Sequence, residues 1–181
     1  MDFLELVRTR RSIRAYQDRP VEEEKLTRIL EAARLAPSWA NKQCWSFVVV
    51  RDGQLIEEVA KSAGIGHRFL RDAPVIVAVC ADPVVSGHRN DMDYFLVDAA
   101  ITMEHLVLAA TELELGTCWI VGFDENKVKA VLGVPIDQRV VALTPVGYPG
   151  DDGGLGNRLR KAVVGASERK PMEELVHWDR W

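Results

Sequence analysis

The chain has 181 residues, of which 48% are hydrophobic and 28% are charged. This length and composition fit one compact domain that buries most of its apolar surface on folding. The formal net charge is -4, so the overall field repels nucleic acids and anionic membranes rather than attracting them. We therefore expect neither nucleic acid nor membrane as a partner, and any site for an anionic ligand must be local.

Three cysteines, Cys44, Cys80 and Cys118, lie in apolar or aromatic surroundings without the paired spacing of a metal site. An odd number of such cysteines is typical of reduced thiols in the cytoplasm. The four histidines also lack metal-ligand spacing, so no metal site is predicted. The first residues, MDFLELVRTRR, resemble neither a signal peptide nor a transit peptide. We expect a cytoplasmic protein.

The first half of the chain predicts helices and buried strands in mixed order. Asp2 can cap a short helix that ends near the basic residues 8–14. Helical spacing of apolar residues from Glu22 onward predicts a second helix that stops at Pro37. The β-branched stretches SFVVV (46–50) and VIVAVCA (75–81) predict buried strands, with a helix over 55–63 between them. The polar residues 83–90 predict a loop that overhangs a pocket.

The most apolar stretch, residues 94–115, is long enough to span a bilayer, but it contains acidic residues such as Asp98 and Glu104. Each acid near a membrane centre costs about 2.5 to 3.5 kcal/mol, which favours a buried soluble helix covered by the domain or by another subunit. A strand over 117–121, a helix over 124–132 and a strand over 139–146 follow. Because helices and strands mix without regular βαβ alternation, the class is α+β, in a single domain over residues 1–181.

Three short clusters contain the candidate site residues. If residues 10–14 (RRSIR) are extended, then Arg10, Ser12 and Arg14 share one side, where guanidinium and hydroxyl groups suit a phosphate. A solvated basic patch at a helix C-terminus is the alternative.

The second cluster, residues 36–45 (APSWANKQCW), offers hydroxyl, amide and aromatic groups that can match the edge of a heterocycle. A self-satisfied turn with two packed tryptophans is the alternative. In the third cluster, residues 115–123 (LGTCWIVGF), glycines let a ligand approach backbone N–H groups, and a plain core strand is the alternative.

In order and separation, these clusters resemble the nitroreductase family, particularly its short members. The RRSxR start of the family is similar to residues 10–14, and its PSxxNxQPW loop to residues 37–45. Its long apolar helix followed by GTCWIGxF resembles residues 98–123, PxGYP matches 145–149, and RKPxEExVHxDRW matches 169–181. The chain departs from the family pattern at Cys44, where proline is usual, and at Glu114, where glycine is common.

The resemblance implies a central, mostly antiparallel sheet flanked by helices, a long buried helix, and an obligate-type homodimer with FMN between the subunits. Arg10 would lie toward the FMN phosphate and Arg14 near the N1/O2 edge of the ring, while the amides of Val121 and Gly122 would face N5 and O4. His67 is a candidate for lining the substrate mouth. The remaining residues implied at the cofactor are Arg11, Ser12, Ser38, Trp39, Asn41, Gln43, Arg169 and Lys170.

The implied function is that of an FMN-dependent NAD(P)H oxidoreductase. It would reduce small planar acceptors such as nitroaromatics, quinones or enones by ping-pong, two-electron transfer through flavin N5. The flavin would do the redox chemistry, so no catalytic side chain is required. The alternative from another class is a non-enzymatic flavin-binding sensor or storage protein on the same fold.

Overall fold

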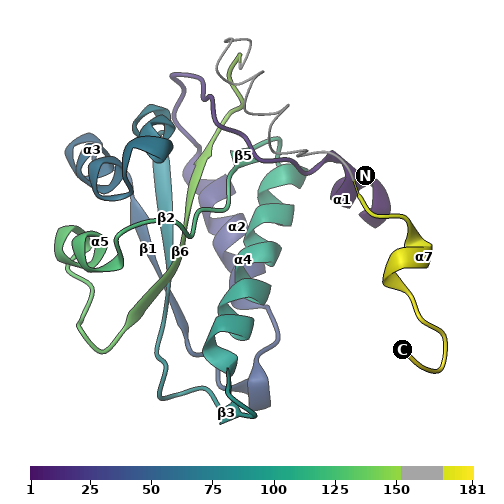
Figure 1. Ribbon diagram of the computed structural model, residues 1–181. Helices are drawn as coiled ribbons and strands as arrows, with labels where there is room; N and C mark the ends of the chain where they lie inside the picture. Colours follow the sequence, from purple (N-terminus) through teal and green to yellow (C-terminus); the bar gives the residue numbers. More distant parts are fainter. Residues whose placement is uncertain (152–168) are drawn as a thin grey trace. The chain divides into compact units, whose positions relative to one another are not determined.

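The computed structural model describes residues 1–151 and 169–181. The chain divides into two compact units, Met1–Asp151 and Asp152–Trp181, and each is described by itself. In the first unit, helices cover both faces of a central antiparallel sheet (Figure 1), which confirms the predicted α+β class and sheet type. A single domain over residues 1–181 stays a prediction.

The sheet contains β1 (Trp45–Val50), β2 (Val75–Ala81), β6 (Arg139–Gly147) and β5 (Gly116–Thr117), in the order β1-β2-β6-β5, with every neighbouring pair antiparallel. Every residue of β2 is buried, because both of its faces are covered. Alternate side chains of a strand point to opposite faces, so the valines at 75, 77 and 79 lie in one core and residues 76, 78 and 80 in the other.

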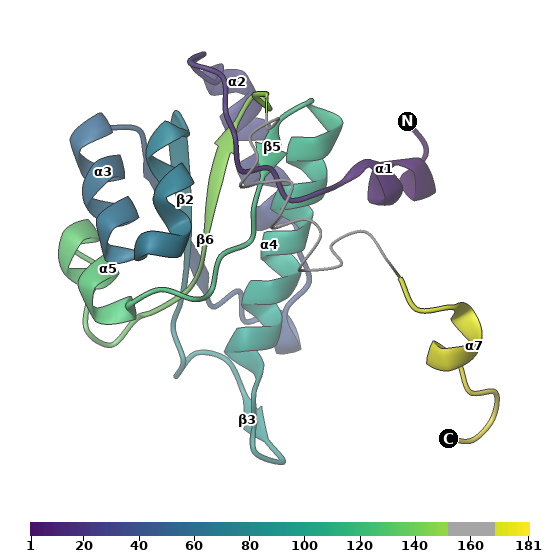
Figure 2. The ribbon, with the colours of Figure 1, turned by 45° about the horizontal axis from the view of Figure 1, so that its top comes forward.

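The first core lies between the sheet and two helices, α2 (Glu23–Arg34) and α4 (Tyr94–Glu112). Figures 1 and 2 both show these helices side by side on one face. The hydroxyl of Thr102 donates to the carbonyl of Ala33 at 2.6 Å, which fixes α4 against α2 without leaving a buried polar group unpaired.

The second core lies on the opposite face, beneath α3 (Gly53–Ser62), η2 (Ile65–Asp72) and α5 (Glu125–Leu132). Asp52 caps α3 by accepting from the backbone N–H groups of Gln54 and Leu55, each at 2.9 Å. The helix α5 ends at Gly133, whose φ of 65° is left-handed and suits glycine.

Judged by length and composition alone, one helix among the described residues, α4, could cross a membrane. Its residues Phe95, Ala99, Met103 and Leu106 nevertheless belong to the core shared with β2 and α2. These residues bury one side of the helix within the domain, whereas the sequence predicted burial on several sides. Its opposite side exposes apolar residues, including Leu96.

Two details differ from the predictions. The strand expected over residues 117–121 is shorter, because after Thr117 the N–H of Cys118 donates to the hydroxyl of Thr144 at 3.3 Å, and only Ile120 rejoins β6 by a single bridge. The loop expected over residues 83–90 contains a short strand, β3 (His88–Arg89), which forms a hairpin with β4 (Met92–Asp93). Figure 2 shows this hairpin projecting beyond the beginning of α4.

The remaining described elements are short. Asp2 caps α1 (Phe3–Thr9), as predicted, by accepting from the N–H of Glu5 at 2.9 Å. A 3-10 turn, η1 (Trp39–Asn41), precedes β1. In the second unit, α7 (Met172–Leu175) has no buried residue.

Candidate functional site

The basic segment at residues 10–14 runs beside β5. Ser12 forms a parallel bridge with Thr117, and the N–H of Ile13 donates to the carbonyl of Thr117 at 2.8 Å. Ile13 is buried against Gly116, where an added Cβ would lie 2.7 Å from its side chain. The extended conformation expected for this segment is therefore present, and it depends on the absence of a side chain at position 116.

The three arginines of this segment have charge available for a ligand. Arg10 and Arg14 are half-buried and Arg11 is exposed. None of their guanidinium groups forms an ion pair or a side-chain hydrogen bond with a described residue. Guanidinium groups with open donors beside the Ser12 hydroxyl suit the phosphate group of a ligand.

Val121 and Gly122, which follow β5 in the chain, are both exposed. Their backbone N–H groups donate to no described residue. Val121 lies four positions after Thr117 in the chain, so the two residues are at most roughly 13 Å apart. One elongated ligand lying along this strip can therefore contact the arginines at one end and the two amides at the other.

His67 lies next to this amide end. An added Cβ on Gly122 would lie 3.8 Å from Cε1 of His67. The Nδ1 atom of His67 lies 2.7 Å from the carbonyl oxygen of Ala63. Because a carbonyl can only accept, Nδ1 carries hydrogen in this contact, and Nε2 is the ring nitrogen left for a ligand.

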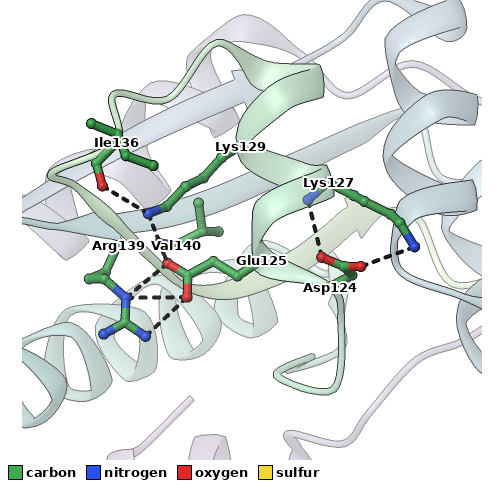
Figure 3. A network of polar contacts seen from close by, with 7 residues as sticks. All are labelled: Asp124, Glu125, Lys127, Lys129, Ile136, Arg139 and Val140. Atoms are coloured by element: carbon green, nitrogen blue, oxygen red, sulfur yellow. Dashed lines mark hydrogen bonds and ion pairs between the residues drawn. The ribbon is translucent and has the colours of Figure 1, made fainter.

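A polar network fixes the chain directly after this segment (Figure 3). Asp124 caps α5 by accepting from the N–H of Lys127 at 3.2 Å. The carboxylate of Glu125 accepts from Nε of Arg139 at 2.9 Å and from Nζ of Lys129 at 3.3 Å, and the N–H of Val140 donates to it at 3.0 Å. The Arg139 guanidinium is the main cause that holds the pKa of Glu125 below its usual value. The network attaches the start of α5 to β6 and so limits where residues 121–123 can move.

A pocket with a volume of about 190 Å³ opens between this segment, β6 and the first turn of α4. Most of its lining residues are apolar, but polar atoms form the larger part of its exposed wall, and the Glu125–Arg139 ion pair belongs to this polar part. The lining residues are Phe95, Leu96, Val121, Phe123, Glu125, Arg139, Val140 and Val141.

The second cluster forms a compact turn before β1. The Oγ atom of Ser38 accepts from the N–H of Gln43 at 2.9 Å, and the side-chain amide of Gln43 donates to Oδ1 of Asn41 at 3.1 Å. These bonds pair some of the turn's polar groups with one another, as expected from the alternative interpretation of this cluster as a self-satisfied turn. Trp39 is not packed into the core, because 45% of its surface is exposed.

This turn is held by Asp98, a residue that the sequence analysis treated only as an argument against a membrane helix. The N–H of Trp39 donates to Oδ1 of Asp98 at 2.8 Å, and the hydroxyl of Ser86 donates to Oδ2 at 2.8 Å. A carboxylate inside an apolar helix was the available signal, because buried charges require partners.

The predicted cofactor residues of the first unit fall into two groups. The first group consists of Arg10, Arg11, Ser12, Arg14, Val121 and Gly122, and the second of Ser38, Trp39, Asn41 and Gln43. The first group lies beside β5 (residues 10–14) or after it (Val121 and Gly122), and the second precedes β1. These two strands are opposite edges of the sheet, roughly 14 Å apart at three strand spacings. One chain therefore does not bring the two groups together.

The comparisons with known proteins agree with this fold. The model of the nitroreductase family matches residues 7–67 and 59–148. The chain belongs to the nitroreductase family. A relative from Archaeoglobus fulgidus, whose name includes the words NADH dehydrogenase and NAD(P)H nitroreductase, is 37% identical over 155 residues, covering 83% of this chain and 87% of that protein.

Solved structures show the same fold. A nitroreductase family protein from Clostridium novyi NT is 38% identical with a TM-score of 0.81, covering 84% of this chain and 88% of that one. An FMN-dependent nitroreductase from Clostridium difficile R20291 is 28% identical with a TM-score of 0.80, covering 99% of this chain and 100% of that one. The predicted family and its nitroreductase-like fold are confirmed.

The two departures from the nitroreductase pattern now have a structural setting. Glu114 has a φ of 63°, which is the left-handed region that favours glycine. Cys44 is buried with its Sγ atom 3.6 Å from Oδ2 of Asp98, and burial, followed by the charge of Asp98, raises the pKa of its thiol to about 11. Cys44 is therefore a neutral thiol donor, and its replacement of proline adds a contact to the turn.

The predicted phosphate-binding residues Arg169 and Lys170 belong to the second unit and are exposed there. Their role stays a prediction. Of the glycine-rich insert before them, Gly150 to Ala166, residues 152–166 lie outside the described residues.

Proposed function

We propose that this nitroreductase-family chain is an FMN-dependent NAD(P)H oxidoreductase that reduces small planar acceptors such as nitroaromatics, quinones or enones. The observation that carries the proposal is the first group, in which guanidinium groups and two amide N–H groups that have no partner among residues 1–151 and 169–181 lie on two neighbouring segments. This donor set fits FMN, whose phosphate needs cations and whose ring edge needs hydrogen-bond donors. The FMN-dependent nitroreductase among its structural neighbours supports the same cofactor.

In this proposal each residue orients the cofactor or stabilises charge. Arg10 and Ser12 bind the phosphate, and Arg14 lies near the N1/O2 edge, where its positive charge stabilises the negative charge that develops there. The amides of Val121 and Gly122 donate to the N5/O4 edge. Bound FMN supplies two-electron transfer between the nicotinamide and the acceptor, in ping-pong order. No side chain is required as a nucleophile.

We further propose that the protein is a cytoplasmic homodimer with FMN between its subunits. The separation of the two groups within one chain supports this assembly, since Ser38, Trp39, Asn41 and Gln43 of a second copy can complete the cofactor site. The exposed apolar residues of α1, Phe3, Leu4 and Val7, and those on the outer side of α4 are further support, because such surfaces need a cover.

The test is the double variant Arg10→Ala/Arg14→Ala, with Arg34→Ala/Arg51→Ala as a charge-matched control. Arg34 and Arg51 form exposed ion pairs with Glu31 and Glu23, away from residues 10–14. Charge-assisted contacts contribute about 1.5 to 3 kcal/mol each, so the first variant should lose most of its flavin absorbance on purification and the control should keep it. Equal flavin occupancy in all three proteins would refute the assignment.

Turnover separates the enzyme from a flavin-binding sensor or storage protein. NAD(P)H oxidation by the purified holoprotein is measured with and without menadione or a nitroaromatic. Acceptor-dependent oxidation supports the proposal, and bound flavin without turnover in any acceptor supports the sensor or storage function.

A further inference from the structure

We propose that Asp98 is a positioning residue that sets the conformation of the turn at residues 38–43 and the place of the Trp39 ring. The inference rests on the proposed function, because it takes this turn to contact the flavin. It adds residues that the family resemblance did not assign, Asp98 together with Ser86 and Gly87.

Asp98 connects three segments through one buried carboxylate. Only 2% of the residue is exposed, and it lies in the apolar helix α4. Trp39 donates to it from the backbone at 2.8 Å, Ser86 from its hydroxyl at 2.8 Å, and Cys44 from its thiol at 3.6 Å. Trp39 lies near the start of the turn and Cys44 directly follows its last residue, so the carboxylate fixes the positions of both ends of the turn.

The turn needs such a constraint because its backbone is strained. Ala40, Asn41 and Gln43 have φ values of 47°, 55° and 50°, a left-handed conformation that is unfavourable for residues with a side chain. Conformations of this kind persist only where surrounding contacts hold them, and they are concentrated at functional sites. A buried carboxylate with donors from both ends of the turn is a contact of this kind.

Once Asp98 has placed the backbone of Trp39, contacts with Tyr94 and Gly87 fix the orientation of its ring. It stacks on Tyr94, with ring centroids 5.8 Å apart and planes at 27°. On Gly87 an added Cβ would lie 2.9 Å from Cε2 and Cζ2 of the indole, so glycine is required for this approach. Because 45% of Trp39 stays exposed, it presents an aromatic surface on which a planar ring can stack. Asp98 therefore positions the backbone from which the Trp39 side chain extends, and Tyr94 and Gly87 orient the exposed face of its indole ring.

The experiment compares Asp98→Asn and Gly87→Ala with two controls. Asp98→Asn keeps the size of the side chain but replaces one acceptor by a donor facing Ser86 or Trp39, and Gly87→Ala displaces the indole without altering the carboxylate. Gly53→Ala is the matched control, because an added Cβ there meets no atom within 4 Å. Ile56→Ala, in the core on the opposite face of the sheet, controls for lost stability.

Two readouts are used. The first is hydrogen exchange of the peptide containing Trp39 in the FMN-free protein, which should accelerate in Asp98→Asn and Gly87→Ala but not in the controls. The second is the dissociation constant of FMN from fluorescence titration, which should rise roughly tenfold or more in Asp98→Asn, as expected for loss of a bond to a charged group. It should also rise in Gly87→Ala, because the displaced indole loses its place for stacking on the flavin. Ile56→Ala should lower the melting temperature while its FMN affinity stays at the wild-type value.

The outcomes separate this inference from the proposed function. Wild-type protein that binds no FMN overturns the proposed function and, with it, this inference. If the wild-type protein binds FMN and Asp98→Asn binds it with the wild-type affinity, only the role of Asp98 is overturned, whatever the affinity of Gly87→Ala. If Asp98→Asn does not fold, Ser86→Ala removes a single donor and should weaken FMN binding by about threefold to tenfold; unchanged binding in Ser86→Ala and Gly87→Ala then overturns it.

Discussion

The variant Gly116→Ala tests how the basic segment is attached to the sheet. An added Cβ would lie 2.7 Å from Cγ1 and 2.8 Å from both Cβ and Cγ2 of Ile13, well inside contact distance. Ile13 is β-branched and therefore stiff, and its N–H is bonded to Thr117, so it cannot turn aside without breaking that bond. Overpacking of this kind costs about 1 to 3 kcal/mol, which corresponds to a fall in melting temperature of roughly 2 to 12 °C for a chain of this size.

The assay is thermal unfolding of the FMN-free protein at one concentration, followed by FMN titration. Because Ile13 lies between Ser12 and Arg14, we expect the same variant to bind FMN more weakly. Gly53→Ala serves as the control with no steric conflict, and its melting temperature should be unchanged or slightly higher. A Gly116→Ala protein with wild-type melting temperature and FMN affinity would refute the attachment of this segment through Ile13.

Two further predictions concern backbone strain and acid stability. Glu114 has a φ of 63°, so Glu114→Gly should raise the free energy of unfolding in urea by roughly 0.5 to 1 kcal/mol. Gly133 has a φ of 65°, and a Cβ added there meets no atom within 4 Å, so Gly133→Ala should lower the free energy of unfolding by about the same amount through backbone strain alone. The hydroxyl of Tyr148, 2.6 Å from Glu22, is the main cause that lowers the pKa of Glu22 from 4.5 to about 2. A lowered carboxyl pKa stabilises the fold above pH 4.5, and the effect is lost as the pH falls toward 2. The stability difference between the wild type and Tyr148→Phe should therefore be constant above pH 4.5 and shrink below it; a difference that grows on acidification would contradict this.

The regular elements could be predicted because their signals are local. The fully apolar run at Val75–Ala81 indicates a strand covered on both faces, and the structure has helices on both. The hairpin at residues 88–93 was missed because its strands contain only two residues each, too few to show an alternating pattern. Its turn residues Asn90 and Asp91, both with positive φ, were the available signal. The shortened strand after Thr117 was missed because a hydroxyl of another strand, Thr144, replaces a backbone partner.

The candidate site was predicted from the order of short motifs, and this order indicates candidate residues but not which of them lie close together. The alternation of Arg10, Ser12 and Arg14 followed from an extended backbone, and the bridge to Thr117 agrees with it. The role of Asp98 could not be derived in the same way, since its partners Trp39 and Ser86 lie 59 and 12 residues away. Long-range pairing of a buried charge depends on packing that no local pattern encodes.

The sheet order explains why the two predicted groups stay apart within one chain. Residues 38–43 enter β1 and residues 117–122 leave β5, and these two strands are opposite edges with β2 and β6 between them. Rotation of side chains cannot close a separation of three strand spacings, and the central strands are fixed by the cores on both faces. The separation therefore supports the proposed homodimer, in which a second copy of the chain contributes residues 38–43 to the cofactor site that residues 10–14 and 121–122 begin.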